Sequence, residues 1–296
     1  MRALPFWGVH AAAVFGVLLI GWSWTGLALA IALYYARMFF VTAGFHRFFA
    51  HRTFKTSRTL QFVLALGGTF AVQKGVLWWA ANHRTHHRYS DRPGDVHSPR
   101  QRGFWWSHVG WFLSDEHRQT EWKRIHDFAR YPELRWLNRH HLIPPVALAL
   151  LLLVTGGPWA LIWGFFVSTV LLWHGTFVVN SLAHLFGRQR YDTSDDSRNN
   201  LVIALVTMGE GWHNNHHRYP GAANQGFFWW EIDATYYILR VMSYFGLIWD
   251  LRRAPQNLHI KDCQPTPAPR LANAGADAAS GYPRRRIDWG ARFFPR

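Results

Sequence analysis

The sequence predicts an all-α integral membrane protein, with four transmembrane helices in two hairpins and a cytosolic helical cap. Of its 296 residues, 49% are hydrophobic and 17% are aromatic. Two long stretches, residues 3–36 and 142–187, contain no Asp, Glu, Lys or Arg. Groups of histidines stand near the ends of these stretches and between them. The elements follow in order along the chain.

The first charge-free stretch, with the apolar residues after Arg37, is long enough for two helices of ~20 residues each. The segment 21–26, GWSWTG, separates them, so we expect spans at about 5–22 and 26–45. A small-residue motif within the stretch resembles a signal-peptide cleavage site. However, the apolar residues continue to Phe45, which a cleaved signal would not need. We therefore expect a retained hairpin.

The second charge-free stretch, residues 142–187, is 46 residues long and also predicts two spans. Thr155-Gly-Gly-Pro158 interrupts it near the middle, and this places the spans at about 142–156 and 158–182. Charge-free runs of this length are much more typical of membrane spans than of a soluble core.

The charges predict the topology. The two short connections are uncharged, whereas the cap segments 46–141 and 184–254 carry most of the Lys and Arg behind the formal net charge of +15. By the positive-inside rule, the cap and both termini lie on the cytoplasmic side of the cytoplasmic (inner) membrane. Residues 1–254 form the membrane domain, and 255–296 is a basic Pro/Ala/Arg-rich tail that we expect to be mostly disordered. The basic face suits anionic lipid headgroups, and no nucleic acid is needed to explain it.

Histidines recur in four groups that this topology brings to one membrane face. They occur in HRFFAH (46–51), HRTHH (83–87), NSLAH (180–184) and HNNHH (213–217). Histidines at i, i+3 and i+4 share one face of a helix. Nine imidazoles are too many for one ion and suit a dinuclear centre with places left for water or dioxygen. Imidazole serves Fe, Zn, Cu and Ni alike, so ligand type leaves the metal open. The nine candidates are His46, His51, His83, His86, His87, His184, His213, His216 and His217.

Three of these groups, HRFFAH, HRTHH and HNNHH, resemble the histidine boxes of the membrane fatty acid desaturase family. GEGWHNNHH, NSLAH and TAGFHRFFAHRTF are similar to its stearoyl-CoA (acyl-CoA delta-9) desaturase branch, and we expect a bacterial member. The resemblance runs from about Thr42 to about Arg253 and includes RGFWWSHVGW. It implies an oxygen-dependent enzyme that inserts a cis double bond between carbons 9 and 10 of a saturated fatty acyl chain, with two electrons supplied from outside.

The resemblance also implies the site. The nine histidines would hold two Fe ions, which zinc can replace in overexpressed protein, with O2 as co-substrate. Asn180 would hold a metal-bound water. The substrate tunnel would be lined by Tyr34, Met38, Gln73, Trp79, Thr176 and Phe177. Tyr34 and Met38 stand where the family closes the methyl end of the tunnel.

The acyl carrier and the electron donor are less clearly implied. Ser114-Asp-Glu116 and Ala81 stand where animal acyl-CoA members carry basic residues. Acyl-CoA is our first expectation, with acyl-lipid or acyl carrier protein as alternatives. Because we see no appended haem-binding domain, we expect a separate electron donor such as ferredoxin, rubredoxin or cytochrome b5 with a reductase. Substitute phosphate-binding residues are Lys74, Arg84, Arg88, Lys123 and Arg124.

Two other functions compete. A membrane diiron hydroxylase would use the same ligands, because the same oxidant can return a hydroxyl group. A metal transporter or haem carrier would spread its ligands through the spans, where only His10 and His174 lie. Arg37 is unexplained: it lies roughly 13 Å from His46 along a helix, and intramembrane arginines are functional or paired. Outside the boxes, and not assigned to the metals, are His97, His108, His117, His126, His140, His141 and His259.

Overall fold

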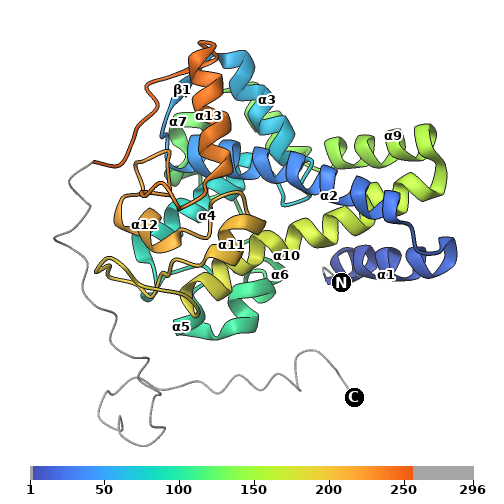
Figure 1. Ribbon diagram of the computed structural model, residues 1–296, viewed down its shortest axis with the longest axis horizontal. Coiled ribbons are helices and arrows are strands. Elements are labelled where there is room, and N and C mark those ends of the chain that lie inside the picture. The colour runs from blue at the N-terminus through green and yellow to red at the C-terminus, as the bar shows by residue number, and fades with distance from the viewer. Residues whose placement is uncertain (1–2, 256–296) are drawn as a thin grey trace, which may run out of the picture. The chain divides into compact units, whose positions relative to one another are not determined.

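Three apolar helical segments dominate the computed structural model, which describes residues 3–255 (Figure 1). Ala3–Ile20, Trp24–Ala50 and Ile143–His184 are each long and apolar enough to cross a membrane. The predicted tail, apart from Pro255, lies outside the described residues. The described part is therefore mostly helical, with three candidate spans where the sequence predicted four.

The third segment reverses direction within itself. Gly157 has φ 66° and ψ −164°, outside the helical region, and Pro158 follows it. A Cβ on Gly164 would approach the Leu152 side chain to 3.1 Å. In one straight helix these two positions would lie about 18 Å apart. Ile143–His184 is thus a helical hairpin, turning where the sequence placed the break.

The described residues contain helices of three kinds and one short strand pair. The α-helices are α1 (Ala3–Ile20), α2 (Trp24–Phe39), α3 (Arg58–Thr69), α4 (Val76–Tyr89), α5 (Pro99–Arg102), α6 (Trp111–Leu113), α7 (His126–Ala129), α8 (Pro132–Arg139), α9 (Ile143–Ala160), α10 (Ser168–Ser181), α11 (Leu201–Val206), α12 (His213–Arg218) and α13 (Ala234–Tyr244). The π-helices are η1 (Phe40–Ala50), η2 (Trp106–Gly110) and η4 (Leu161–Val167), and the 3₁₀-helices are η3 (Trp122–Arg124) and η5 (Leu182–His184).

A two-stranded antiparallel ribbon is the exception to the all-α prediction. β1 (Lys55–Thr56) pairs with β2 (Ile248–Trp249), with Lys55 opposite Trp249 and Thr56 opposite Ile248. Strands of two residues carry no alternating pattern that a sequence could reveal. The ribbon ties the segment after η1 to the end of the described chain.

The long helices pack together and lead into the smaller elements. α1, α2, α9 and α10 run side by side, and the remaining elements gather at one end of them (Figure 1). Between η1, α3 and α4 lies a buried apolar cluster that includes Phe45, Phe49, Leu64 and Leu77. This cluster fixes η1 against α4, the two elements that carry the first two histidine boxes.

The first histidine box lies on a π-helix, which explains its spacing. In an α-helix, residues five apart are rotated by about 140° and point away from each other. Hydrogen bonds in a π-helix join residues five apart, so these residues lie one above the other. The His51 amide donates to the His46 carbonyl at 3.1 Å, and the two imidazole centroids are 4.8 Å apart. The wider helix therefore brings both histidines to one face.

Candidate metal centre

The structure brings the nine candidate histidines together in two groups. His46 comes from η1 and His51 is the residue that caps its C-terminal end. Three histidines come from α4, His184 comes from η5 and three come from α12. Within each group, one nitrogen of every histidine lies within 4.8 Å of the others. The first group is His46, His51, His83, His87 and His216, and the second is His86, His184, His213 and His217.

The separations between imidazole nitrogens fit ligands that share an ion. His46 Nε2 lies 3.1 Å from His216 Nε2, which lies 3.0 Å from His87 Nε2. In the second group, His184 Nε2 and His213 Nε2 are 3.0 Å apart. Two nitrogens that are each about 2.1 Å from one metal ion are about 3 Å apart when they subtend a right angle. Buried nitrogens without a hydrogen-bond partner, including His86 Nε2 and His217 Nε2, also fit an ion.

Four carboxylates orient four of these histidines by contacting their Nδ1 atoms. Asp95 contacts His86 Nδ1 at 2.9 Å, and Asp91 contacts His184 Nδ1 at 2.8 Å. Asp195 and Glu210 contact the Nδ1 atoms of His217 and His46 at 2.7 and 2.5 Å. A carboxylate on Nδ1 leaves Nε2 free to bind a metal and makes it more basic.

The sequence interpretation missed these four acids. The sequence did contain a pattern that could have identified them. The chain has only 17 Asp and Glu residues, and several of the four acids stand close to a histidine box. Glu210 lies three positions before His213, and Asp91 and Asp95 lie within nine positions of His86.

Burial keeps many of the imidazoles neutral, which is the form that binds metal. Burial away from water is the main cause that lowers the pKa of His51, His83 and His87 well below the ordinary value, and the neighbouring imidazoles lower it further. Burial would also lower the pKa of His86, but Asp95 outweighs it and raises that pKa. Burial would raise the pKa of Glu210, but His46 and Arg47 outweigh it and hold that pKa at about 2.

The histidines outside the boxes fall into different places. The His97 ring lies against His86, with centroids 4.2 Å apart, and forms a smaller candidate group with His86 and Asp95. His108, His174 and His10 form a hydrogen-bonded row, with N···N distances of 2.9 and 3.0 Å. Neither box group includes His117, His126, His140 or His141, and His259 lies outside the described residues.

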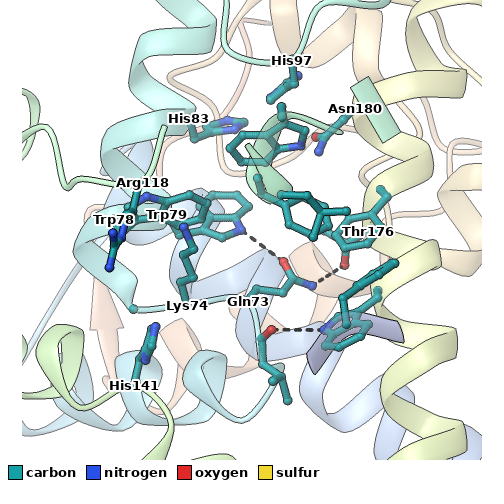
Figure 2. Close-up of a pocket in the computed structure, with 18 of the residues that line it drawn as sticks. Gln73, Lys74, Trp78, Trp79, His83, His97, Arg118, His141, Thr176 and Asn180 are labelled. Atoms are coloured by element: carbon teal, nitrogen blue, oxygen red, sulfur yellow. Dashed lines mark hydrogen bonds between the residues drawn. The ribbon is translucent and has the colours of Figure 1, made fainter. Parts of the chain in front are cut away.

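A cavity of about 560 Å³ adjoins the histidines. His83 and Asn180 line it, and Figure 2 shows them near His97 at one end. Four residues predicted to line the substrate tunnel also line this cavity: Gln73, Trp79, Thr176 and Phe177. The cavity falls in the size range of sites that bind small molecules, and its wall is mostly apolar and aromatic.

Three polar side chains of the cavity wall are bonded to one another (Figure 2). Trp79 Nε1 donates to Gln73 Oε1 at 3.2 Å, and Gln73 Nε2 donates to Thr176 Oγ1 at 3.0 Å. The Trp79 ring stacks on His83, with centroids 5.0 Å apart and planes 19° apart. The cavity wall is therefore linked directly to a candidate metal ligand.

Tyr34 and Met38 lie outside the residues that line the cavity. Both belong to one buried cluster, which also contains Leu172 and packs against Trp79. A Cβ on Gly175 would meet the Tyr34 hydroxyl at 2.4 Å, so Tyr34 packs directly on the α10 backbone. Met38 and Tyr34 therefore stand behind the cavity wall, and their role as a tunnel stop remains a prediction.

The other end of the cavity has a basic rim. Lys74, Arg118 and His141 line it, and no Asp or Glu is among its lining residues in the described part of the chain. The Lys74 ammonium sits 4.0 Å from the centroid of the Trp78 ring. Of the five substitute phosphate-binding residues, Lys74 alone lines this cavity.

Arg84, which the sequence suggested as a phosphate-binding residue, does not line the cavity and instead bonds within the protein. It pairs with Asp127 at 2.9 Å and donates to the Phe49 and Ala50 carbonyls at the end of η1. Glu116, which stands where animal acyl-CoA members carry basic residues, is paired with Arg102.

Comparisons with known proteins agree with this site. The chain matches the fatty acid desaturase family model over residues 22–250. It is 37% identical over 256 residues to the sn-1 stearoyl-lipid 9-desaturase of Anabaena variabilis, which covers 86% of this chain and 94% of the relative. It is 39% identical over 248 residues to the sn-2 palmitoyl-lipid 9-desaturase of a Nostoc strain, covering 82% and 86%. An acyl-CoA 5-desaturase of Anemone leveillei is 37% identical over 241 residues, covering 80% and 74%.

Proposed function

The chain belongs to the fatty acid desaturase family and is a fatty acyl desaturase, an oxidoreductase, and we propose that it places a cis double bond between carbons 9 and 10 of a saturated chain. The observation that carries this proposal is the continuity of the cavity with the histidine groups. His83 belongs to both, and Asn180 lines the cavity beside it. A chain lying in the cavity passes next to the candidate metal ligands.

The nine histidines fit two iron ions, which would supply, with O2 and two electrons, the oxidising power that no side chain has. The residues of the chain do the rest. Phe177, Trp79 and Trp173 exclude water from the cavity and leave few positions for an alkyl chain. The bonded side chains of Gln73, Trp79 and Thr176 fix the wall beside His83, so one methylene pair faces the ligands.

We further propose that both arms of each hairpin cross the cytoplasmic membrane, with the histidine groups and both termini on the cytoplasmic side. The uncharged connections and the basic character of the remaining segments support this orientation. Electrons would come from a separate donor protein. Arg52 and Arg88 are exposed next to the half-buried His51 and His87, and this basic surface suits an acidic one-electron carrier.

Lipid analysis of cells that express the chain tests the proposed reaction. We expect a new monounsaturated acid with its double bond between carbons 9 and 10, absent from cells with the empty vector. Gas chromatography with mass spectrometry of derivatised fatty acids would show the position. A hydroxylated product would favour the membrane hydroxylase instead, and an unchanged lipid profile in cells with iron-loaded protein would contradict both.

The basic rim predicts an acyl carrier with phosphate groups, because Lys74, Arg118 and His141 all line this part of the cavity. CoA and anionic membrane lipids share this chemistry. Purified enzyme with an electron donor should be given stearoyl-CoA in one arm and vesicles of labelled stearoyl phosphatidylglycerol in the other. We expect Lys74→Met to raise the KM for the true carrier about tenfold through loss of a charged contact. An unchanged KM in both arms would contradict a phosphate-binding rim.

The buried cluster behind the cavity predicts the chain-length preference. Met38→Ala should open space beside Trp79 and Leu172, and each extra methylene buried there contributes ~0.8 kcal/mol. We expect a shift toward longer acyl chains, with the double bond at the same distance from the carboxyl end, measured with acyl substrates of graded length. Tyr34→Ala should lengthen the accepted chain further only when Met38 is also truncated.

Leu134→Ala is a matched control for Met38→Ala, because Leu134 is fully buried in a different apolar cluster. It should cost ~2–5 kcal/mol of stability without changing the shape of the chain-length profile. If Met38→Ala also scales the profile down evenly, then Met38 only packs the helices.

A further inference from the structure

The intramembrane arginine has partners that the sequence did not reveal. Arg37 lies inside α2 and is 3% exposed. Its Nη2 donates to Ser168 Oγ at 2.6 Å, and its Nη1 donates to Thr169 Oγ1 at 2.9 Å. The same Nη1 donates to the Phe70 carbonyl at 3.3 Å, and Nε donates to the Leu33 carbonyl at 3.1 Å. All four of these acceptors are neutral, so Arg37 forms no ion pair among these contacts.

One of these acceptors begins an irregular loop, residues 70–75. Phe70 caps the C-terminal end of α3, and Gly75 precedes α4. Val72 and Lys74 both have left-handed backbones, with φ of 57° and 64°, which is strained for residues with a side chain. A segment that holds two such residues needs surrounding contacts to keep it in place.

Side chains from two long helices hold this loop by its carbonyl groups. Arg37 of α2 binds the Phe70 carbonyl. Trp173 of α10 donates its indole N–H to the Ala71 and Val72 carbonyls, at 3.1 and 3.2 Å. Carbonyls away from water must find donors within the protein. The Arg37 charge also suits its position, because the end of α3 carries partial negative charge.

The loop held in this way forms part of the cavity wall. Val72, Gln73, Lys74 and Gly75 all line the cavity. Figure 2 shows Gln73 and Lys74 among them. The amide of Gln73 joins Trp79 to Thr176, and Trp79 stacks on the candidate ligand His83. A displacement of the loop backbone would therefore move the wall relative to the histidines.

We propose that Arg37 is a positioning residue that, together with Trp173, fixes loop 70–75 and so determines which methylene pair faces the metal centre. The proposal rests on the proposed desaturase function. Arg37 touches neither the cavity nor the histidine groups. It acts through the Phe70 carbonyl and the Gln73 amide, and the property it controls is the position of the double bond.

The test is the distribution of double-bond positions made by Arg37→Met and Trp173→Phe. Arg37→Met keeps a flexible unbranched side chain, although a shorter one, and removes its donors. Trp173→Phe keeps an aromatic ring and removes the indole N–H. For each we expect the ratio of off-position to 9,10 product to rise about tenfold, equal to roughly 1.4 kcal/mol. Arg37→Lys retains the charge but lacks the guanidinium that binds four acceptors, so it should fall between Arg37→Met and the unchanged protein.

The control is Arg130→Met, which removes an exposed arginine that contacts Tyr131 and should leave the distribution unchanged. Metal content is measured in every variant, so that loss of metal is not mistaken for misplacement of substrate. If folded, metal-loaded Arg37→Met and Trp173→Phe give lower activity with the original distribution, the arginine is a stability residue and the proposal is wrong. Should Arg37→Met fail to accumulate, Arg37→Lys and Trp173→Phe decide together, because Arg37 holds the Phe70 carbonyl and Trp173 holds the next two carbonyls of the same loop. An unchanged chain that makes no double bond would contradict the proposed function itself.

Discussion

His216→Ala is expected to abolish desaturase activity and to lower bound metal from two ions per chain to about one. His216 Nε2 lies about midway in the first group, 3.1 Å from His46 Nε2 and 3.0 Å from His87 Nε2. Substitution of a residue that only hydrogen-bonds to a metal ligand costs about 10–100-fold in metal affinity or activity. Loss of a ligand itself should therefore cost more than ~100-fold. Elemental analysis of purified protein and the activity assay provide the two measurements.

His126→Ala is the matched control, because His126 is exposed and belongs to neither histidine group. It should keep two ions per chain and full activity. Both variants should still enter the membrane, since helix hydrophobicity is unchanged. An active, fully metal-loaded His216→Ala protein would contradict the ligand assignment, and one ion in the unchanged protein would contradict a dinuclear centre.

The candidate histidines could be identified from the sequence because histidine recurs within a few positions in each box. For His83, His86 and His87, the i, i+3, i+4 spacing places all three on one face of α4, and the same spacing places three on α12. His46 and His51 gave no such signal. Their spacing suits a π-helix, which is too rare for a sequence pattern to indicate.

Contacts between distant segments could not be predicted. Asp91 reaches His184 across 93 positions, and Glu210 reaches His46 across 164. Arg37 meets Ser168 and Thr169 on a helix more than 130 positions away. Such pairs depend on how helices pack, and packing leaves no periodic trace in one sequence. The break at Gly157 was predictable, because a glycine followed by proline interrupts a helix by its own geometry.

Arg47, in the first histidine box, carries the second large expected effect. It is 1% exposed and lies between two buried carboxylates. Its Nη2 is 3.0 Å from Glu210 Oε1 and 2.9 Å from Asp233 Oδ1, and its Nη1 donates to the Ala223 carbonyl at 2.6 Å. The two acids have further tasks: Glu210 orients His46, and Asp233 caps α13 by accepting from the Tyr236 amide at 3.0 Å.

We expect Arg47→Met to destabilise the protein strongly and to weaken metal binding. Breaking a buried ion pair from one side leaves uncompensated charge and costs about 3–5 kcal/mol. For a chain of this size the midpoint of thermal unfolding should fall by about 5–8 °C. Because Glu210 would lose one of its partners, His46 should also be held less firmly, and metal should dissociate faster. Thermal unfolding in detergent, followed by fluorescence, measures the first effect, and chelator-driven metal release measures the second.

Arg52→Met separates this effect from the mere loss of an arginine. The Arg52 side chain is 62% exposed and pairs with Asp127 at 3.2 Å. An exposed pair contributes at most ~1 kcal/mol, so the unfolding midpoint should move by no more than a few degrees. Arg47→Lys should lie between the two, because lysine restores a charge but cannot donate to Glu210, Asp233 and Ala223 together. If Arg47→Met unfolds at the same temperature as Arg52→Met, the buried ion pairs around Arg47 do not stabilise the protein, and the link from Asp233 through Arg47 to His46 has no energetic role.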